Sequence, residues 1–307
     1  MKNKHLLKKF TKNYSDYFEE FIYRFPNPIS KKQNFISSNF EEKKLAKELK
    51  KEGIIAIKDF YKDDKLREIQ NAFNNEITRI NELPQNSFDE KKKTPITHYK
   101  LFDYYNVVSF DKKDNSTHNL NPLNADKLFL EVILDDRIRS IISEYLGKKI
   151  TLQQAAIGRI YPRETENYSS YQWHRDTHGK RVNVMILLSD ISSNEQRMSF
   201  LKKSHKKFLT KDECRDYSRI SDEKANSMNL KRFECFGSAG TIFLFDANGV
   251  HRGNRNLTRN RDVILFSYGA GRYEWEFDVS LKIKNSLTIN NNQKIFLENN
   301  IKIKWID

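Results

Sequence analysis

Three residues of the sequence carry side chains that suit a single metal ion: His174, Asp176 and His251. His174 and Asp176 stand two positions apart, and on a strand such residues point to the same face with Cα atoms about 6.6 Å apart. An imidazole and a carboxylate placed in this way can bind one ion. A second histidine completes the two-histidine, one-carboxylate triad that holds Fe(II) and leaves coordination positions open. His251, which follows the apolar stretch 241–245 and a turn, is the candidate for that second histidine.

An arginine accompanies the candidate metal ligands. Arg261 comes ten residues after His251, at the start of the apolar stretch 262–266. A guanidinium presents a planar fork of donors to a carboxylate, and a buried guanidinium needs such a partner. Together, the triad and the arginine predict an Fe(II) site whose co-substrate is 2-oxoglutarate.

The segments that must position these residues are mostly strands. Short apolar stretches separated by turn signals predict strands over 150–161, 182–188, 241–245 and 263–268. Earlier in the chain, periodic apolar residues predict a helix from Asp63 to before Pro84 and another through Ile138 and Tyr145 that ends at Gly147. The tail from Phe277 to Trp305 is predicted as further strands. Several short strands without regularly alternating helices favour an antiparallel sandwich or barrel.

Composition narrows the class of protein. With 37% hydrophobic and 12% aromatic residues among 307, the chain can bury a core. We predict an irregular N-terminal arm over 1–45 and a single domain over 46–307 whose core motifs lie within 150–270. Because no segment offers about 20 uncharged apolar residues and the first residues do not resemble a signal peptide, we expect a cytoplasmic protein without a membrane partner.

The balance of charges bears on the partners. A formal net charge of +14 favours anionic partners. Nucleic acid is nevertheless an unlikely partner, because no recognised nucleic-acid-reading motif accompanies the charge. A small-molecule substrate is the expected partner, and the sequence does not indicate the oligomeric state. Cys214 and Cys235 stand in no metal or redox pair and are expected to be free thiols.

The sequence resembles the phytanoyl-CoA dioxygenase family of Fe(II)/2-oxoglutarate-dependent oxygenases. The resemblance is strongest in Trp173-His174-Arg175-Asp176, in 184–190, in Ser204-His205-Lys206 and in 240–266, and it continues more weakly in 47–53 and 134–147. It implies a mainly β fold with flanking helices, a double-stranded β-helix or jelly-roll barrel of the cupin-like kind. It also implies that the triad binds iron, that Arg261 binds the distal carboxylate of 2-oxoglutarate, and that Asn256 and Thr258 shape the approach to that arginine.

Two departures from the family pattern affect these assignments. The family usually places its arginine one residue later than Arg261, so Arg259 is a second choice for the carboxylate partner. A loop motif is altered to Gln196-Arg197-Met198 and Lys202-Lys203-Ser204-His205. Asp176, by contrast, matches hydroxylating members, because halogenating relatives lack this carboxylate.

Polar residues inside the predicted strands are candidates for further contacts. Of Gln153, Gln154, Arg159 and Asn183, we favour Gln153 and Asn183 as further 2-oxoglutarate contacts, together with Thr258, and Arg159 as a substrate contact. His178 shares a face with His174 and Asp176 and is predicted to line the substrate pocket rather than to bind metal. The remaining histidines at 98, 118 and 205 are expected to be ordinary polar residues.

These observations predict a dioxygenase that hydroxylates an aliphatic C–H of a small, preferably anionic metabolite and releases succinate and CO2, with Fe(II), 2-oxoglutarate and O2 as cofactor and co-substrates. Two alternatives keep the barrel: a metal-dependent cupin-like enzyme that does not use 2-oxoglutarate, and a catalytically silent binding module. A nucleic-acid repair oxygenase is a further alternative, although the sequence lacks the Asn-x-Tyr motif of the nucleotide pocket expected of one.

Overall fold

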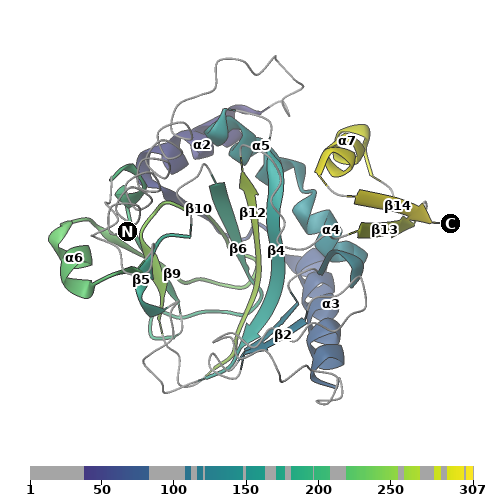
Figure 1. The fold of residues 1–307 in the computed structure, drawn as a ribbon, viewed down its shortest axis with the longest axis horizontal. Helices are drawn as coiled ribbons and strands as arrows, with labels where there is room; N and C mark the ends of the chain where they lie inside the picture. The colour runs from purple at the N-terminus through teal and green to yellow at the C-terminus, as the bar shows by residue number, and fades with distance from the viewer. Residues whose placement is uncertain are drawn as a thin grey trace, which may run out of the picture.

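Two antiparallel β-sheets face one another in the computed structural model of the chain, and helices cover the outer face of the larger sheet (Figure 1). The structure describes residues 38–82, 108–111, 116–119, 122–147, 150–162, 171–176, 181–195, 197–207, 219–254, 259–269, 280–284, 289–300 and 302–306. This architecture, together with the structural matches reported below, confirms the predicted jelly-roll fold with flanking helices.

The larger sheet contains the four long strands that the sequence predicted. Its order is β1 (Ile54–Ile57), β10 (Ile242–Asp246), β6 (Arg181–Leu187), β12 (Arg261–Gly269), β4 (Thr151–Ile160), β3 (Ser116–Asn119) and β2 (Val108–Asp111). Both faces of its central strands are covered, which explains why their sequences are almost continuously apolar rather than alternating.

The smaller sheet is made of strands too short for a clear periodic signal. Its order is β8 (Arg219–Ile220), β5 (Trp173–His174), β11 (His251–Gly253), β7 (Met198–Leu201) and β9 (Arg232–Cys235). Along the chain, β4, β5, β6 and β7 alternate between the two sheets, as do β9, β10, β11 and β12. This alternation brings residues that are distant in the sequence together between the sheets.

The helices begin and end where local chemistry dictates. They are α2 (Phe40–Glu52), α3 (Asp63–Asn81), α4 (Lys127–Ile133), α5 (Asp136–Leu146), α6 (Asp222–Ser227) and α7 (Asn291–Asn300). The Asp135 carboxylate caps the start of α5 by accepting from the backbone N–H of Arg137 and Ile138. Gly147, with φ of 64°, ends α5 in the left-handed conformation, as predicted.

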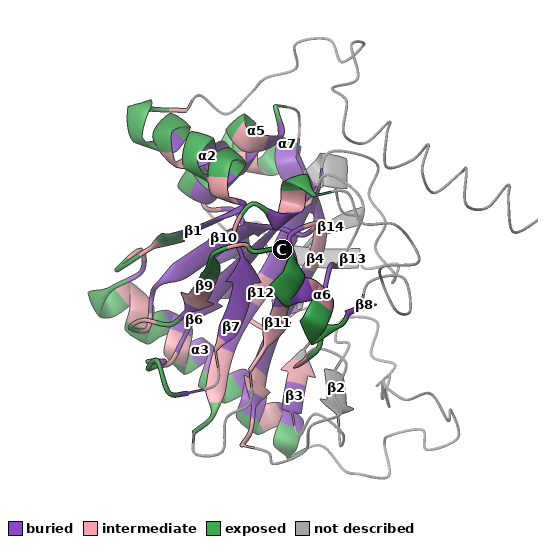
Figure 2. Cartoon of the chain, turned by 90° about the vertical axis from the view of Figure 1, so that its left-hand side faces the viewer, coloured by how far each residue is buried: buried purple, intermediate pink, exposed green. Residues whose placement is uncertain are grey.

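Two buried layers hold the domain together. Side chains of α2, α3, α4 and α5 pack on the outer face of the larger sheet, against residues such as Val184 and Phe266. A second cluster fills part of the space between the sheets, where Met185 and Phe245 meet Phe200 and Cys235 from the smaller sheet. Figure 2 shows the central strands as almost wholly buried.

Two predicted segments differ from the structure. Helix α2 begins at Phe40, so the boundary drawn at residue 45 between arm and domain falls within a helix; the rest of the predicted arm, residues 1–37, lies outside the described residues. The tail holds the parallel strands β13 (Ser280–Lys284) and β14 (Lys302–Ile306), but also helix α7. The asparagine run at 290–292 lies at the start of that helix, where Asn290 and Gln293 form a reciprocal capping box.

No helix within the described part of the chain is long and apolar enough to cross a membrane.

Candidate active site

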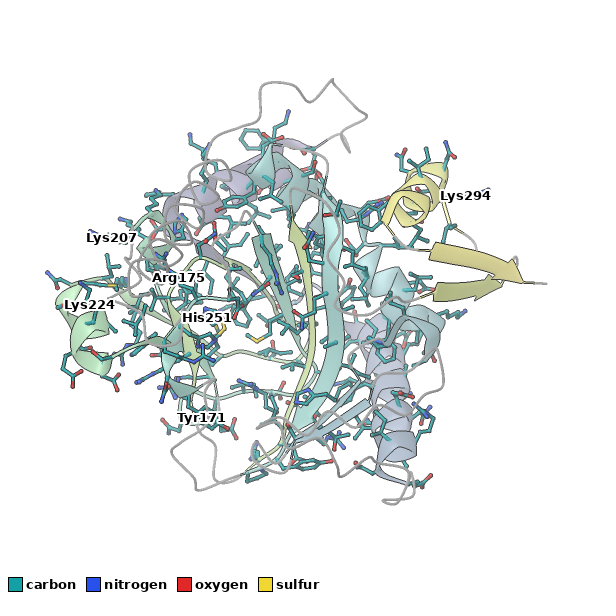
Figure 3. All side chains as sticks on the ribbon, viewed as in Figure 1. Tyr171, Arg175, Lys207, Lys224, His251 and Lys294 are labelled. Carbon is teal, nitrogen blue, oxygen red and sulfur yellow. The ribbon has the colours of Figure 1, made fainter. Side chains whose placement is uncertain are left out.

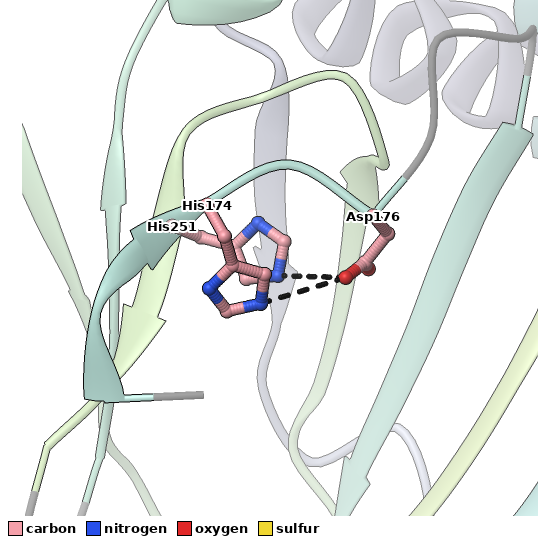
Figure 4. Close-up of side chains that lie close together, drawn as sticks. All are labelled: His174, Asp176 and His251. Carbon is pink, nitrogen blue, oxygen red and sulfur yellow. Dashed lines mark ion pairs between the residues drawn. The ribbon is translucent and has the colours of Figure 1, made fainter. Parts of the chain in front are cut away.

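The predicted metal ligands come together between the two sheets. His174 at the end of β5 and His251 at the start of β11 are direct partners in the antiparallel pairing of these strands. Side chains of directly opposite residues lie on the same face, with Cβ atoms about 5 Å apart. Asp176 follows β5 on the same face as His174, and its backbone N–H donates to the carbonyl of Ala247. Strand pairing therefore explains why residues from two distant segments meet (Figure 4).

The distances within this cluster fit one metal ion. Nε2 of His174 and Nε2 of His251 each lie 3.5 Å from Oδ1 of Asp176. One ligand atom from each of the three residues lies within 4.8 Å of the other two. Atoms that each bind one ion at about 2.1 Å are separated by roughly 3 to 4 Å. The donor set is two nitrogens and one carboxylate oxygen, which suits Fe(II) in a facial triad.

Hydrogen bonds to the backbone orient both imidazoles. Nδ1 of His174 lies 2.7 Å from the carbonyl oxygen of Gln172, and Nδ1 of His251 lies 2.9 Å from that of Gly249. A carbonyl can only accept, so each Nδ1 carries the proton and each Nε2 keeps its lone pair for a metal. Both rings point their free nitrogens at the Asp176 carboxylate (Figure 4).

Asp176 is oriented by a neighbouring strand. The side-chain amide of Asn183 on β6 donates to Oδ2 of Asp176, which leaves Oδ1 facing the two histidines. The side chain of Asp176 is 30% exposed, whereas those of His174 and His251 are 10% and 6% exposed. The cluster is therefore most accessible on the Asp176 side.

The electrostatics of the cluster favour metal binding. Burial lowers the pKa of His174, and the nearby His251 lowers it further, so His174 is neutral and ready to bind. Burial opposes the ionisation of Asp176, but the imidazoles, His251 foremost, hold its pKa well below the ordinary value. Burial also opposes protonation of His251, but the Asp176 carboxylate outweighs it and raises the pKa of His251. A metal cation bound between these groups would supply the positive charge that a proton on His251 otherwise supplies.

Arg175 and Ser204 hold the backbone around the triad through hydrogen bonds to backbone groups. Arg175 follows His174 and so points to the opposite face of the strand, where its guanidinium donates to the carbonyls of Ser204 and Lys207. Figure 3 shows Arg175 on the side of the molecule where Lys207 lies. The hydroxyl of Ser204 accepts from the backbone N–H of Val250 at 2.7 Å and donates to the carbonyl of Leu201 at 2.6 Å. Ser204 belongs to the altered loop motif, and it fixes the residue that immediately precedes His251.

Arg261 and Arg259 are placed very differently. Arg261 lies on the same face of β12 as Val263 and Leu265, because residues two apart on a strand share a face. Val263 and Leu265 pack into the cluster between the sheets, so the side chain of Arg261 faces the same space. Burial raises the pKa of the Cys235 thiol on β9, and the charge of Arg261 opposes that rise. The side chain of Arg259 is 71% exposed and pairs with Glu195. Of the two arginines, only Arg261 faces the interior.

The other predicted contacts divide into two groups. Asn183 touches Asp176, and Gln153 lies on the inner face of the larger sheet, where its amide donates to Oγ1 of Thr151. Arg159 lies on the helix-covered face: it makes two hydrogen bonds of 2.8 Å to Asp262 and sits 5.5 Å from the ring centre of Phe73. The structure does not bring Arg159 to the triad, because neighbouring residues of a strand point to opposite faces.

Thr258, Asn256 and His178 lie outside the described residues. Of the histidines expected to be ordinary polar residues, His118 bonds Ser116 Oγ and His205 bonds the carbonyl of Lys50, both away from the triad.

Residues next to the triad that sequence reasoning missed are Arg181 and Ser267. Arg181 bonds Gln154, and Ser267 pairs with Asn183 across β12 and β6. The available signal was the alternation of Arg181 and Asn183 with Val182 and Val184 at the start of β6, which predicts two polar side chains on one face.

Comparisons with known proteins agree with this site. The family model described as phytanoyl-CoA dioxygenase (PhyH) matches residues 49–262, more than half of the chain. No curated protein matches the sequence.

Solved structures share the fold. One describes the epimerase SnoN with Fe3+, alpha ketoglutarate and nogalamycin RO; it is 13% identical, with a TM-score of 0.56 over 75% of this chain and 83% of that chain. Another describes EctD from S. alaskensis with 2-oxoglutarate and 5-hydroxyectoine; it is 17% identical, with a TM-score of 0.55 over 80% of this chain and 81% of that chain. A second EctD structure, with bound Fe, has a TM-score of 0.53 at 17% identity over 80% and 82% of the two chains.

The family match therefore confirms the predicted oxygenase class, whose cofactor is iron and whose co-substrates are 2-oxoglutarate and O2. The chain belongs to the phytanoyl-CoA dioxygenase family.

Proposed function

We propose that this enzyme uses O2 to hydroxylate an aliphatic C–H of a small, preferably anionic metabolite, and that 2-oxoglutarate is converted to succinate and CO2 in the same reaction. The observation that carries the proposal is the convergence of His174, Asp176 and His251 on one point between the sheets, with their free ligand atoms turned inward. The presence of the carboxylate supports hydroxylation over halogenation, since a halide would need its position.

Each residue of the site has a definable task in this reaction. The triad would hold Fe(II), and Arg261 would bind the distal carboxylate of 2-oxoglutarate through paired N–H donors. Apolar side chains of Met185, Leu187, Val263 and Leu265 lie on the inner face between Arg261 and the triad end of the sheet, and they exclude water. Iron and 2-oxoglutarate, when bound, supply the oxidising power, and the protein supplies position and a dry cavity.

The test is reconstitution without oxygen, followed by air. Protein loaded anaerobically with Fe(II) and 2-oxoglutarate is exposed to O2 with a metabolite library, and succinate and products heavier by one oxygen atom are measured. We expect succinate release that disappears in His174→Ala. A chain that binds iron but never consumes 2-oxoglutarate would instead be a cupin-like enzyme of another kind, and a chain that binds no iron would be a silent barrel.

A matched pair of variants tests the carboxylate contact. Arg261→Ala is expected to abolish binding of 2-oxoglutarate to the anaerobic Fe(II) protein, whereas Arg259→Ala, which removes an exposed guanidinium two residues away, is expected to leave it unchanged. The reverse result would transfer the role to Arg259.

A further inference from the structure

The inner face of the larger sheet has a polar end beside Asp176. It is formed by Arg181 and Asn183 of β6, Ser267 of β12 and Gln154 of β4. Ser267 is the direct partner of Asn183 on one side and of Gln154 on the other, so these three side chains form a row across the sheet. Arg181 stands one step further along the same face, and its Nη2 donates to Oε1 of Gln154 at 2.6 Å. We call these four residues the polar row.

Three buried polar atoms of the polar row have unused hydrogen-bonding capacity. Nε of Arg181, Oδ1 of Asn183 and Oγ of Ser267 are buried and bond to no group within the part of the chain that the structure describes. A buried polar atom left without a partner destabilises the folded chain. These three atoms lie on two neighbouring strands, β6 and β12, and buried groups without partners are explained where a ligand satisfies them.

The border of this end is also polar. Gly269 is the partner of Arg181 on β12, and a Cβ atom there would lie 2.9 Å from Nε2 of Gln153. Because Gly269 has no side chain, the Gln153 side chain can lie against it, and the Gln153 amide donates to Oγ1 of Thr151. The polar row is thus bordered by a further amide rather than by an apolar residue.

The charges show which kind of ligand would fit. Burial lowers the pKa of Arg181 from an ordinary value so high that the guanidinium stays charged, and Asp176 is the carboxylate among the described residues that offsets this charge. In the loaded enzyme, Asp176 is committed to the metal. No other carboxylate of the described residues acts on the charge of Arg181, so this guanidinium suits an anionic group of a ligand.

We infer that Arg181 binds a carboxylate of the substrate, with the hydroxyl of Ser267 as a second donor and Oδ1 of Asn183 as acceptor for an amino or hydroxyl group next to that carboxylate. The inference rests on the proposed function and deepens it, because it assigns the substrate to the amino or hydroxy acids. It places the substrate carboxylate at the triad end of the inner face, away from the arginine that holds 2-oxoglutarate.

The experiment measures binding rather than turnover. The protein is loaded with 2-oxoglutarate and with Zn(II) in place of iron, and ligand-observed NMR follows four probes: L-lactate, propanoate, L-lactamide and inorganic phosphate. We expect L-lactate to bind most tightly, propanoate more weakly, and L-lactamide and phosphate not at all. Arg181→Gln is expected to weaken both carboxylates at least about tenfold, and Arg181→Lys to restore part of the affinity.

Controls separate this inference from the proposed function. Arg67→Gln removes an exposed arginine of α3 and should bind all probes as the unaltered protein does. The 2-oxoglutarate affinity of Arg181→Gln should stay within about twofold of the unaltered protein, which also shows that the variant is folded. Equal binding of L-lactate and L-lactamide, binding of phosphate in place of the carboxylates, or carboxylate binding that survives Arg181→Gln would overturn the inference. Loss of 2-oxoglutarate from Arg181→Gln would assign Arg181 to the co-substrate instead, and failure of the unaltered protein to bind 2-oxoglutarate would contradict the proposed function itself.

Discussion

The side-chain amide of Asn183 donates to one oxygen of the Asp176 carboxylate and thereby turns the other oxygen toward His174 and His251. Partners of this kind set the orientation of a ligand and are worth about 10- to 100-fold in metal affinity. We therefore expect Asn183→Leu to weaken Fe(II) or Zn(II) binding by about that factor, as measured by anaerobic titration against a competing chelator. Asn75→Leu, at an exposed position of α3, serves as the control. Unchanged metal affinity in Asn183→Leu would mean that the strand alone positions Asp176.

Metal binding should stabilise the fold. An ion that binds only the folded chain, through three residues of two separate segments, stabilises it by RT ln(1 + c/Kd) at a free ion concentration c, so tighter binding gives more stability. We expect saturating Zn(II) to raise Tm, a chelator to reverse the change, and His251→Ala to lose the response. If His251→Ala responds to Zn(II) as the unaltered chain does, the ion binds elsewhere.

Ser204→Ala should destabilise the protein although Ser204 is not one of the predicted metal ligands. Its hydroxyl is fully buried and bonds both Val250 and Leu201. Removal of the hydroxyl takes away the acceptor of the buried Val250 N–H and a donor to the Leu201 carbonyl, which costs about 1 to 3 kcal/mol. Urea unfolding measures this cost, and the exposed Ser193→Ala should change the free energy of unfolding by less than about 0.5 kcal/mol. Similar values for the two variants would contradict a positioning role for Ser204.

Arg159 is expected to contribute stability rather than substrate binding. Its guanidinium and Asp262 are largely buried, with side chains 21% and 14% exposed, and they form a bidentate pair. A double-mutant cycle of Arg159→Gln and Asp262→Asn should give a coupling free energy of about 1 to 3 kcal/mol in urea unfolding. A coupling near zero, together with a raised substrate KM in Arg159→Gln, would support the substrate role that the sequence suggested.

Cys235 should make stability depend on alkaline pH. Burial raises the pKa of its thiol well above the ordinary value, so the folded chain keeps the proton when the unfolded chain releases it. The unfolded state then binds fewer protons above pH of about 8.5, and stability falls as pH rises. In a Cys214→Ser background, the free energy of unfolding should drop by about 1 to 2 kcal/mol more between pH 8 and 10 than it does after Cys235→Ala is added. Parallel pH profiles would show that the thiol ionises normally in the folded protein.

The sequence predicted the parts of the fold that have strong local signals. The apolar stripe of α3, the glycine that ends α5 and the four long strands of the larger sheet all lie where expected. The strands of the smaller sheet were mostly missed, because strands such as β5 and β8 span two residues each and cannot show a period. Helix α7 was missed because its asparagine-rich start looks like a turn, although the same residues cap a helix.

The site shows the same division between local and distant information. The triad could be predicted because His174 and Asp176 stand two residues apart and, with the later His251, match the pattern of the family that the sequence resembles. The face on which Arg159 lies was not, because a single polar residue in an apolar strand gives no sign of which side is covered by helices. Arg181 was overlooked for a related reason. Its place in the polar row follows from the pairing of β6 with β12, where Gly269 is its direct partner, and this pairing depends on the tertiary fold.

The direct opposition of His174 and His251 has a consequence for how the smaller sheet is assembled. β5 and β11 are joined by this one residue pair, and β5 continues to the two-residue strand β8 on its other side. An ion held by both histidines is therefore a cross-link between strands that have few hydrogen bonds of their own, much as a disulfide would be. Amide hydrogens around β5 should exchange slowly with solvent once the ion is in place, and faster when it is stripped away.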